Sequence, residues 1–245
     1  MDKIPLKDLF EIASYQWKED LVNISKICFF TKSRVSQDRE KSFALSYGME
    51  QPFLLKALAA KMEAKAFFEI GTGRGTACYA TSLVDSVQRI DTIDIIPPSH
   101  KRQEAIGYEP AMVSNLDLHG MIPFEQKNKI NFHERHEIHK VISRNEKYDL
   151  LFIDGNHTDF HVIYEDFEIC RLIASDNAII VWDDFYPDKF AIKDVVSAVD
   201  RKYDYNMKLV ECRGHLFSNG KTPEKNCGTV IMSKRGYNED LFAKG

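Results

Sequence analysis

Two stretches of the sequence end in acidic residues directly after a run of apolar ones. The first run covers residues 148–153 and is followed by Asp154 and His157. The second covers residues 178–182 and is followed by Asp183 and Asp184. Carboxylates that crowd together repel one another unless a cation or a proton neutralises them. We therefore expect Asp154, Asp183 and Asp184 to share a divalent metal ion, and Mg²⁺ suits such oxygen ligands.

Asp154 and His157 are also the predicted catalytic residues. A carboxylate or an imidazole at the end of a strand can accept a proton from a bound substrate, because imidazole titrates near neutral pH. Two other interpretations stay open on the sequence alone. The three aspartates could cap loops and hydrogen-bond a substrate without any metal. His157 could do no more than hydrogen-bond the loop before a helix.

A glycine-rich turn follows an earlier apolar run, residues 66–70. Glu69 stands near the end of this run, and Gly71, Gly73 and Gly75 follow it. Glycines allow a tight turn and let backbone N–H groups approach a ligand closely, beside the positive start of a helix. The spacing departs from the dinucleotide fingerprint, which needs a small residue where this chain has a threonine. Glu69 would repel a pyrophosphate, so the turn favours a ligand that carries a positive charge.

The next apolar run, residues 89–96, contains Asp94 near its end. A carboxylate at this place can accept hydrogen bonds from both hydroxyls of a ribose. Dinucleotides and other adenosyl ligands all carry such a ribose, so Asp94 predicts a nucleoside without distinguishing between them. The alternative interpretation is an aspartate in a surface turn.

Seven short runs are expected to form strands, and helical segments fit between most of them. The expected strands are residues 66–70, 89–96, 129–134, 148–153, 178–182, 207–212 and 229–233, and the clearest helices are 76–87, 160–173 and 192–202. Alternating strands and helices predict an α/β fold, with a mainly parallel sheet covered on both faces. No helix fits between the last two runs, so the last strand is expected to be antiparallel. Ligands of such sheets bind at the carboxyl ends of the strands, where the strand order reverses.

The first part of the chain is expected to be helical. Leu6, Phe10, Trp17 and Leu21 recur at helical spacing and make one apolar stripe. We therefore expect an N-terminal helical extension, residues 1–64, that packs on one α/β domain, residues 65–245, and helps to close its ligand pocket.

Two segments are expected to be irregular. Residues 31–42 are mostly polar and charged and should form a solvated loop. Residues 107–124 carry prolines and glycines among apolar residues. They are expected to be either a lid over the site or a peripheral helix with irregular ends.

The composition narrows the range of partners. A chain of 245 residues suits one large domain, and its net charge of −4 gives no field that would attract nucleic acid or an anionic membrane. No run of about 18 apolar residues predicts a membrane span. The five cysteines form no CxxC pair, which predicts reduced thiols and a cytoplasmic location. We expect a small-molecule substrate, with neither nucleic acid nor membrane as partner, and leave a homodimer open.

The motif E-I-G-T-G-R-G, with an acid at the end of the next strand, resembles motif I of class I S-adenosylmethionine-dependent methyltransferases. The resemblance covers about residues 52–234. It implies a Rossmann-like sheet of seven strands and S-adenosylmethionine as cofactor. By this likeness Glu69 and the loop Gly71, Thr72, Gly73 and Gly75 would hold the methionine moiety. Asp94 would hold the ribose, and His136 or Glu137 would lie near the adenine.

The pattern I-D-G-x-H…W-D-D resembles metal-dependent O-methyltransferases that act on small molecules, some of whose relatives bind no metal. This likeness implies methylation of a small-molecule hydroxyl with a divalent metal assisting. The chain also lacks the Asn/Asp-Pro-Pro-Tyr type of motif of enzymes that methylate nucleic-acid amines. The alternatives are a metal-independent N-methyltransferase of small molecules, a dinucleotide oxidoreductase, and a scaffold that binds S-adenosylmethionine without catalysis.

Overall fold

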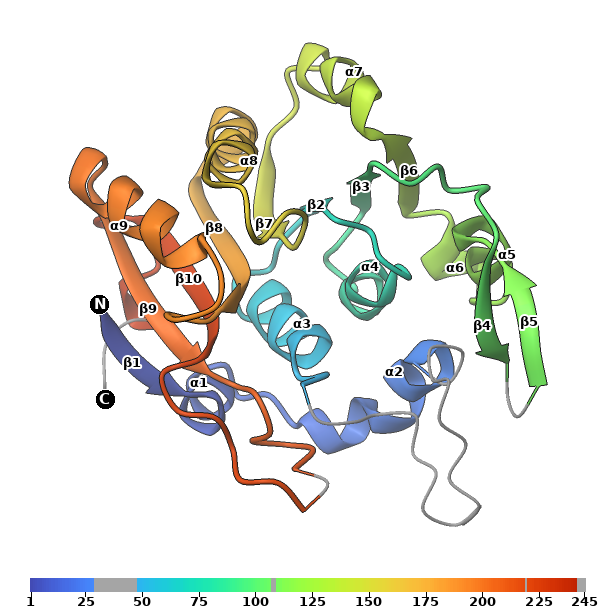
Figure 1. Cartoon of the computed structure of the whole chain (residues 1–245), viewed down its shortest axis with the longest axis horizontal. Coiled ribbons are helices and arrows are strands. Elements are labelled where there is room, and N and C mark those ends of the chain that lie inside the picture. The colour runs from blue at the N-terminus through green and yellow to red at the C-terminus, as the bar shows by residue number, and fades with distance from the viewer. Residues whose placement is uncertain (29–47, 107–108, 219, 242–245) are drawn as a thin grey trace.

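The computed structural model describes residues 1–28, 48–106, 109–218 and 220–241, so the segment predicted as a solvated loop at 31–42 lies outside the described residues. The described chain is a central β-sheet with helices on both faces (Figure 1). No helix within these ranges is both long and apolar enough to cross a bilayer. The cysteines with described side chains, Cys78, Cys170, Cys212 and Cys227, are free thiols.

Within the described ranges, eight strands form one sheet in the order β1-β9-β10-β8-β7-β2-β3-β6. These strands are β1 (Asp2–Pro5), β2 (Ala66–Ile70), β3 (Arg89–Asp94), β6 (Ile130–Glu134), β7 (Tyr148–Ile153), β8 (Ala174–Phe185), β9 (Tyr205–Glu211) and β10 (Gly228–Lys234). β10 is antiparallel to both of its neighbours, and all other pairs are parallel. The predicted α/β fold is confirmed, including the antiparallel last strand. The count of seven strands was one too low, because β1 was not predicted.

The N-terminal segment differs from the helix that its apolar spacing predicted. β1 pairs in parallel with β9 and buries Ile4. Three short helical pieces follow, α1 (Leu6–Ile12), η1 (Trp17–Asp20) and α2 (Leu21–Cys28). The stripe breaks at Ser14, whose φ of 51° is a left-handed conformation that no right-handed helix contains. The boundary between residues 64 and 65 stays a prediction, but the segment before it contributes a strand to the sheet.

Helices cover both faces of the sheet (Figure 1). The helices on one face are α1, α2, α3 (Gln51–Lys61) and α4 (Thr76–Ser82); those on the other are α7 (Ile138–Ser143), α8 (Phe160–Ile173) and α9 (Ile192–Lys202). Successive strand residues point to opposite faces. Phe67 and Val181 therefore pack toward α3, whereas Phe68 and Trp182 pack toward α8. Both faces are mainly apolar, and the polar side chains of the predicted site stand at the carboxyl ends of the strands.

Residues 102–127 form an excursion between β3 and β6 at one side of the molecule (Figure 1). The excursion contains an antiparallel hairpin of β4 (Arg102–Ile106) and β5 (Glu109–Val113), then α5 (Asn115–Gly120) and α6 (Phe124–Lys127). Residues 107–108 lie outside the described chain. A hairpin was not among the expectations for this region. Its use as a lid stays a prediction.

The carboxyl ends of β2 and β7 meet at Gly71. The N–H of Gly71 donates to the carbonyl of Ile93 over 2.8 Å, and the N–H of Asp154 donates to the carbonyl of Ile70 over 2.8 Å. Gly71 has a φ of 96°, and a β-carbon there would lie 2.0 Å from the carbonyl oxygen of Asp154. Only glycine therefore fits between the two strand ends.

We expect Gly71→Ala to lower the free energy of unfolding by at least about 3 kcal/mol, because it combines backbone strain with overlap against a buried main chain. Gly236→Ala is the matched control, since Gly236 has a φ of 88° but nothing within 4 Å of a β-carbon. The control should lose only about 1 kcal/mol from strain. Urea unfolding of both variants measures the difference, and equal losses would contradict the close approach at Gly71.

Candidate active site

The predicted site residues gather where loops leave the carboxyl ends of β2, β3, β7 and β8. β2 lies between β3 and β7, and the chain moves outward from β2 in both directions, so this is the place where the strand order reverses. A pocket opens there. It is lined by Gln51, Glu69, Gly71, Gly73, Phe152 and Asp154, among others. Gln51 was not predicted as a site residue.

Glu69 is buried at the floor of this pocket, with 1% of its surface exposed. Its Oε2 accepts hydrogen bonds from the Sγ of Cys78 over 2.8 Å and from the hydroxyl of Thr92 over 2.6 Å. The Thr92 hydroxyl also lies 2.7 Å from that of Thr72. Burial raises the pKa of Glu69 to about 7, with a further contribution from the charge of Asp94. The carboxyl group is therefore ready to become charged when a cation binds beside it.

Asp94 holds the glycine-rich turn against the end of β3. Its carboxylate accepts the N–H of Gly73 over 3.1 Å and the N–H of Ile96 over 3.0 Å. Each carboxylate oxygen keeps a second lone pair, so two ribose hydroxyls can still be bound. Gly75, with a φ of 76°, forms the N-cap of α4. The loop is thus shaped by its own backbone before any ligand arrives.

Arg102 connects the excursion to this turn. Its guanidinium donates to the carbonyl of Gly73 and, over 2.7 Å, to the side chain of Asn115. Asn115 is buried at the start of α5. This contact could not be predicted from the sequence, because Arg102 has no distinctive spacing and no strand was expected at residues 102–106.

Asp154, His157 and Asp184 form one cluster at the ends of β7 and β8. The Nε2 of His157 lies 3.8 Å from Asp154 Oδ1 and 3.9 Å from Asp184 Oδ2. One donor atom from each residue can be chosen so that all three lie within 4.8 Å of one another. His157 was predicted as a catalytic residue beside the metal rather than as part of the donor set.

Asp183 is not part of this cluster, although it was predicted in the same trio as Asp154 and Asp184. It is buried and accepts hydrogen bonds from Gln51 Nε2 over 2.6 Å and from the Thr229 hydroxyl over 3.0 Å. The cause is local backbone geometry. The pairing of β8 with β10 shifts register between Gly228 and Val230, and Asp184 has a φ of 51°. Such an irregularity re-aims consecutive side chains at the end of a strand.

Burial and mutual repulsion act on the carboxyl groups of the site. Burial, with the charges of Asp183 and Asp184, raises the pKa of Asp154 well above its usual range. Burial and the charge of Asp184 raise the pKa of Asp183 to about 7. Arg213 Nη1 lies 3.7 Å from Asp184 Oδ1 and offsets part of this charge. Near neutral pH the site can therefore take up a cation or a proton.

His157 is held by its surroundings rather than by the start of the next helix. Asp159 is the N-cap of α8 and accepts the N–H of His161 over 2.9 Å. The imidazole of His157 packs against the ring of Phe190 at 5.4 Å, and its carbonyl accepts the N–H of Ala191 over 3.0 Å. The ring therefore lies against the carboxylates. The N-cap of α8 is Asp159 and not His157.

A buried ion pair braces the turn after β7. Arg135, at the end of β6, lies 2.6 Å from Asp166 on α8. A β-carbon at Gly155 would lie 3.3 Å from the carboxylate of Asp166, so the turn packs directly on this pair. These residues come from separate elements, so their spacing could not predict that they interact.

His136 is exposed, with 74% of its side chain accessible, and its Nδ1 lies 3.5 Å from Glu134. Glu137, the other candidate, accepts the N–H of Glu134 over 3.1 Å and pairs with Lys140. Neither residue contributes to the pocket lining described above. Their placement near an adenine ring stays a prediction.

Residues 68–185 match the family described as a methyltransferase domain. These residues form a methyltransferase domain. The match runs from β2 to the end of β8 and includes every predicted site residue. It confirms the predicted class I S-adenosylmethionine-dependent methyltransferase and identifies the chain as an enzyme. No protein of curated function matches the chain in sequence.

Solved structures agree with the methyltransferase fold. The O-methyltransferase TomG from Streptomyces achromogenes, involved in tomaymycin synthesis and solved with S-adenosylmethionine, has a TM-score of 0.57 at 16% identity, over 89% of this chain and 90% of that one. An O-methyltransferase from Bacillus cereus, solved with S-adenosylhomocysteine, has a TM-score of 0.53 at 12% identity, also over 89% of this chain and 90% of that one. At these identities the likeness shows the fold alone.

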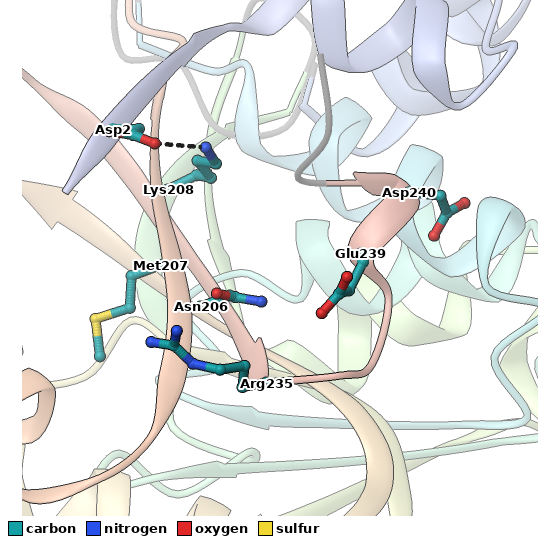
Figure 2. A pocket seen from close by; sticks show the side chains of 7 residues that line it. All are labelled: Asp2, Asn206, Met207, Lys208, Arg235, Glu239 and Asp240. Carbon is teal, nitrogen blue, oxygen red and sulfur yellow. Dashed lines mark hydrogen bonds and ion pairs between the residues drawn. The ribbon is translucent and has the colours of Figure 1, made fainter. Parts of the chain in front are cut away.

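The methyltransferase has another hollow at the edge of the sheet near β1 and β9, which Figure 2 shows from close by. Asp2 pairs there with Lys208 over 2.8 Å. Arg235 pairs with Asp204 over 2.7 Å, and Asp240 with Lys61 over 3.2 Å. β10, β8 and β7 separate this hollow from β2. These charged groups are already paired, with one another or with neighbouring residues, so we assign the hollow no role in methyl transfer.

We expect Glu69→Gln to raise the free energy of unfolding of the ligand-free enzyme at pH 8 and to change it little at pH 5. The folded chain holds a proton on Glu69 up to about pH 7, whereas the ordinary pKa is 4.5. The stability contributed by this proton is lost as the pH rises through that interval, by up to about 3 kcal/mol. Glutamine stays neutral and avoids this loss.

Urea unfolding at both pH values measures the effect. Glu239→Gln is the control, because Glu239 accepts a backbone N–H over 3.2 Å at the surface, far from the site. The same stability change at pH 5 and pH 8 in Glu69→Gln would contradict a raised pKa of Glu69.

Proposed function

We propose that this methyltransferase transfers a methyl group from S-adenosylmethionine to a hydroxyl of a small molecule. The observation that carries the proposal is the cluster of Asp154, His157 and Asp184 beside the pocket of the glycine-rich turn. With a methyl donor bound in this pocket, the cluster would supply proton acceptors next to the methyl group. A hydroxyl needs such acceptors, because it must lose its proton to become a strong nucleophile.

The donor would lie in the pocket above Glu69. The carboxylate of Glu69 suits the positive charge of the methionine moiety, and the backbone of Gly71, Thr72, Gly73 and Gly75 can approach it closely. Asp94 would accept hydrogen bonds from the ribose. The solved relatives with S-adenosylmethionine or S-adenosylhomocysteine bound support this choice of cofactor.

Methyl transfer from a sulfonium is an in-line displacement. The protein has to hold the acceptor oxygen, the methyl carbon and the sulfur in line and keep water away. Asp154 lines the donor pocket and is also a member of the cluster, so it would stand between the two substrates. Asp154 or His157 would accept the proton of the acceptor hydroxyl as the new C–O bond forms.

The donor set fits a divalent cation. Two carboxylates and an imidazole converge, and the pKa of Asp154 is raised by the neighbouring negative charges that a cation would neutralise. Asp154, Asp184 and His157 would hold the ion, with Asp183 adding charge from beside Asp184. A bound Mg²⁺ or similar ion would act as a Lewis acid that lowers the pKa of the acceptor hydroxyl.

We expect label from tritiated S-adenosylmethionine to enter the small-molecule fraction when the enzyme is incubated with a metabolite extract. Parallel reactions with total RNA and DNA should stay unlabelled, since a net charge of −4 gives little attraction for phosphates. His157→Ala should lower the rate by about a hundredfold or more. Label that appears only in nuclease-sensitive polymer would overturn the small-molecule acceptor.

We expect a chelator to abolish turnover and to leave the affinity for S-adenosylhomocysteine nearly unchanged, because the ion would contact the acceptor rather than the donor. Asp184→Asn should behave in the same way. Asp204→Asn, which alters a surface ion pair far from the site, is the control. Calorimetry gives the affinity and the tritium assay gives turnover. Full activity of metal-free enzyme would show that the carboxylates and His157 act as proton acceptors and hydrogen-bond partners alone.

A further inference from the structure

A small polar pocket adjoins the donor pocket on the side of Asp183 and Asp184. Gln51 and Asp183 line both pockets, so the two are neighbours. The inner pocket is narrow and has room for about one water-sized group. Its other polar walls are Glu50, Tyr186 and Arg213.

Glu50 is fully buried and uses only one of its two oxygens. Oε1 accepts the N–H of Gly214 over 2.8 Å, and those of Leu216 and Phe217 over 3.4 Å each. Oε2 is equally inaccessible to solvent and has no hydrogen-bond partner among the described residues. A buried carboxylate oxygen without a partner is costly, so its retention calls for an explanation.

Tyr186, which also lines this pocket, carries a second unpartnered atom. Its hydroxyl is buried and has no hydrogen-bond partner within the described chain. The ring is held in place by the Phe190 ring at 5.6 Å and by the Arg213 guanidinium at 5.2 Å. Phe190 in turn packs on His157. The hydroxyl of Tyr186 is therefore fixed relative to the cluster at the ends of β7 and β8.

The charges around the pocket favour a ligand that donates hydrogen bonds. Glu50, Asp183 and Asp184 contribute three carboxyl groups, and Arg213 is the cation among the lining residues. Both oxygens of Asp183 already accept bonds from Gln51 and Thr229. Oε2 of Glu50 is a buried acceptor that is left for a ligand, and the Tyr186 hydroxyl is able to donate or accept.

We propose that Glu50 and Tyr186 form a recognition subsite for a second hydrogen-bond donor on the methyl acceptor. The inference rests on the proposed function, because it assumes that the acceptor lies against the cluster of Asp154, His157 and Asp184. The acceptor then carries, close to the hydroxyl that is methylated, either another hydroxyl or an ammonium group. Both supply the donor that Glu50 lacks.

Three probes that share one ring test the subsite on enzyme saturated with S-adenosylhomocysteine. They are cyclohexanol, cis-1,2-cyclohexanediol and cis-2-aminocyclohexanol, with dissociation constants measured by ligand-observed NMR. We expect at least one two-donor probe to bind about tenfold more tightly than cyclohexanol, since it satisfies a buried acceptor. Preference for the diol or for the amino alcohol identifies which donor the subsite takes.

Glu50→Gln is the decisive variant. Its carbonyl can still accept the three backbone N–H groups, while its NH₂ replaces the free oxygen, so the advantage of the two-donor probes should disappear. Tyr186→Phe removes one hydroxyl and provides the second variant, with a reduced advantage expected. Glu239→Gln and Tyr237→Phe, at exposed positions, are the controls. Affinity for S-adenosylhomocysteine should stay unchanged in all four.

The outcomes separate the subsite from the proposed function. A two-donor advantage that Glu50→Gln abolishes supports the subsite, even if the enzyme methylates no hydroxyl in a metabolite extract. Equal or undetectable binding of the three probes would overturn it, and so would an advantage that survives in both Glu50→Gln and Tyr186→Phe. Loss of turnover in an extract together with intact probe binding would count against the proposed function alone.

Discussion

The contact between Gly71 and the backbone of Asp154 is the constraint on which the site depends. Two neighbouring strands end at the same level. The chain leaves β2 through Gly71, which has no room for a side chain, and leaves β7 through Gly155, where a β-carbon would lie 3.3 Å from Asp166. This contact brings Glu69, at the floor of the proposed donor pocket, near Asp154, the first carboxylate of the proposed catalytic cluster. The relative position of these two carboxyl groups is therefore set by main-chain geometry.

Charge is the second organising factor. The sheet is mainly apolar on both faces, and several acidic side chains collect at the carboxyl ends of its strands, where burial and repulsion raise the pKa values of Glu69, Asp154 and Asp183. Interactions outside the site stabilise the folded chain against this cost. They are the ion pair of Arg135 with Asp166 and the apolar packing on both faces of the sheet. A site of this kind is costly without ligands and becomes favourable when cations or cationic groups enter it.

The features that sequence reasoning found are those with a local signature. Strands such as β2 and β7 are apolar runs that stop at glycine or aspartate, and the antiparallel β10 follows from a missing helix. The direction of the Asp183 side chain could not be predicted in this way, because it depends on a register shift with a strand that begins 45 residues later. β1 was not predicted, because a strand of four residues is too short to show a clear alternation of apolar and polar side chains. Glu50 and Arg102 act through partners distant in the chain, which spacing cannot reveal.

The pairing of β1 with β9 has a consequence for the sheet as a whole. An open strand edge exposes unpaired N–H and C=O groups that can join to another chain. β1 covers the edge of β9 with a strand of four residues that carries Asp2 and Lys3 and ends at Pro5, where no N–H is available. The terminal strand thus acts as a cover against edge-to-edge aggregation. A chain without residues 2–5 would expose the edge of β9. The first effect of losing β1 would therefore be self-association rather than a defect in catalysis.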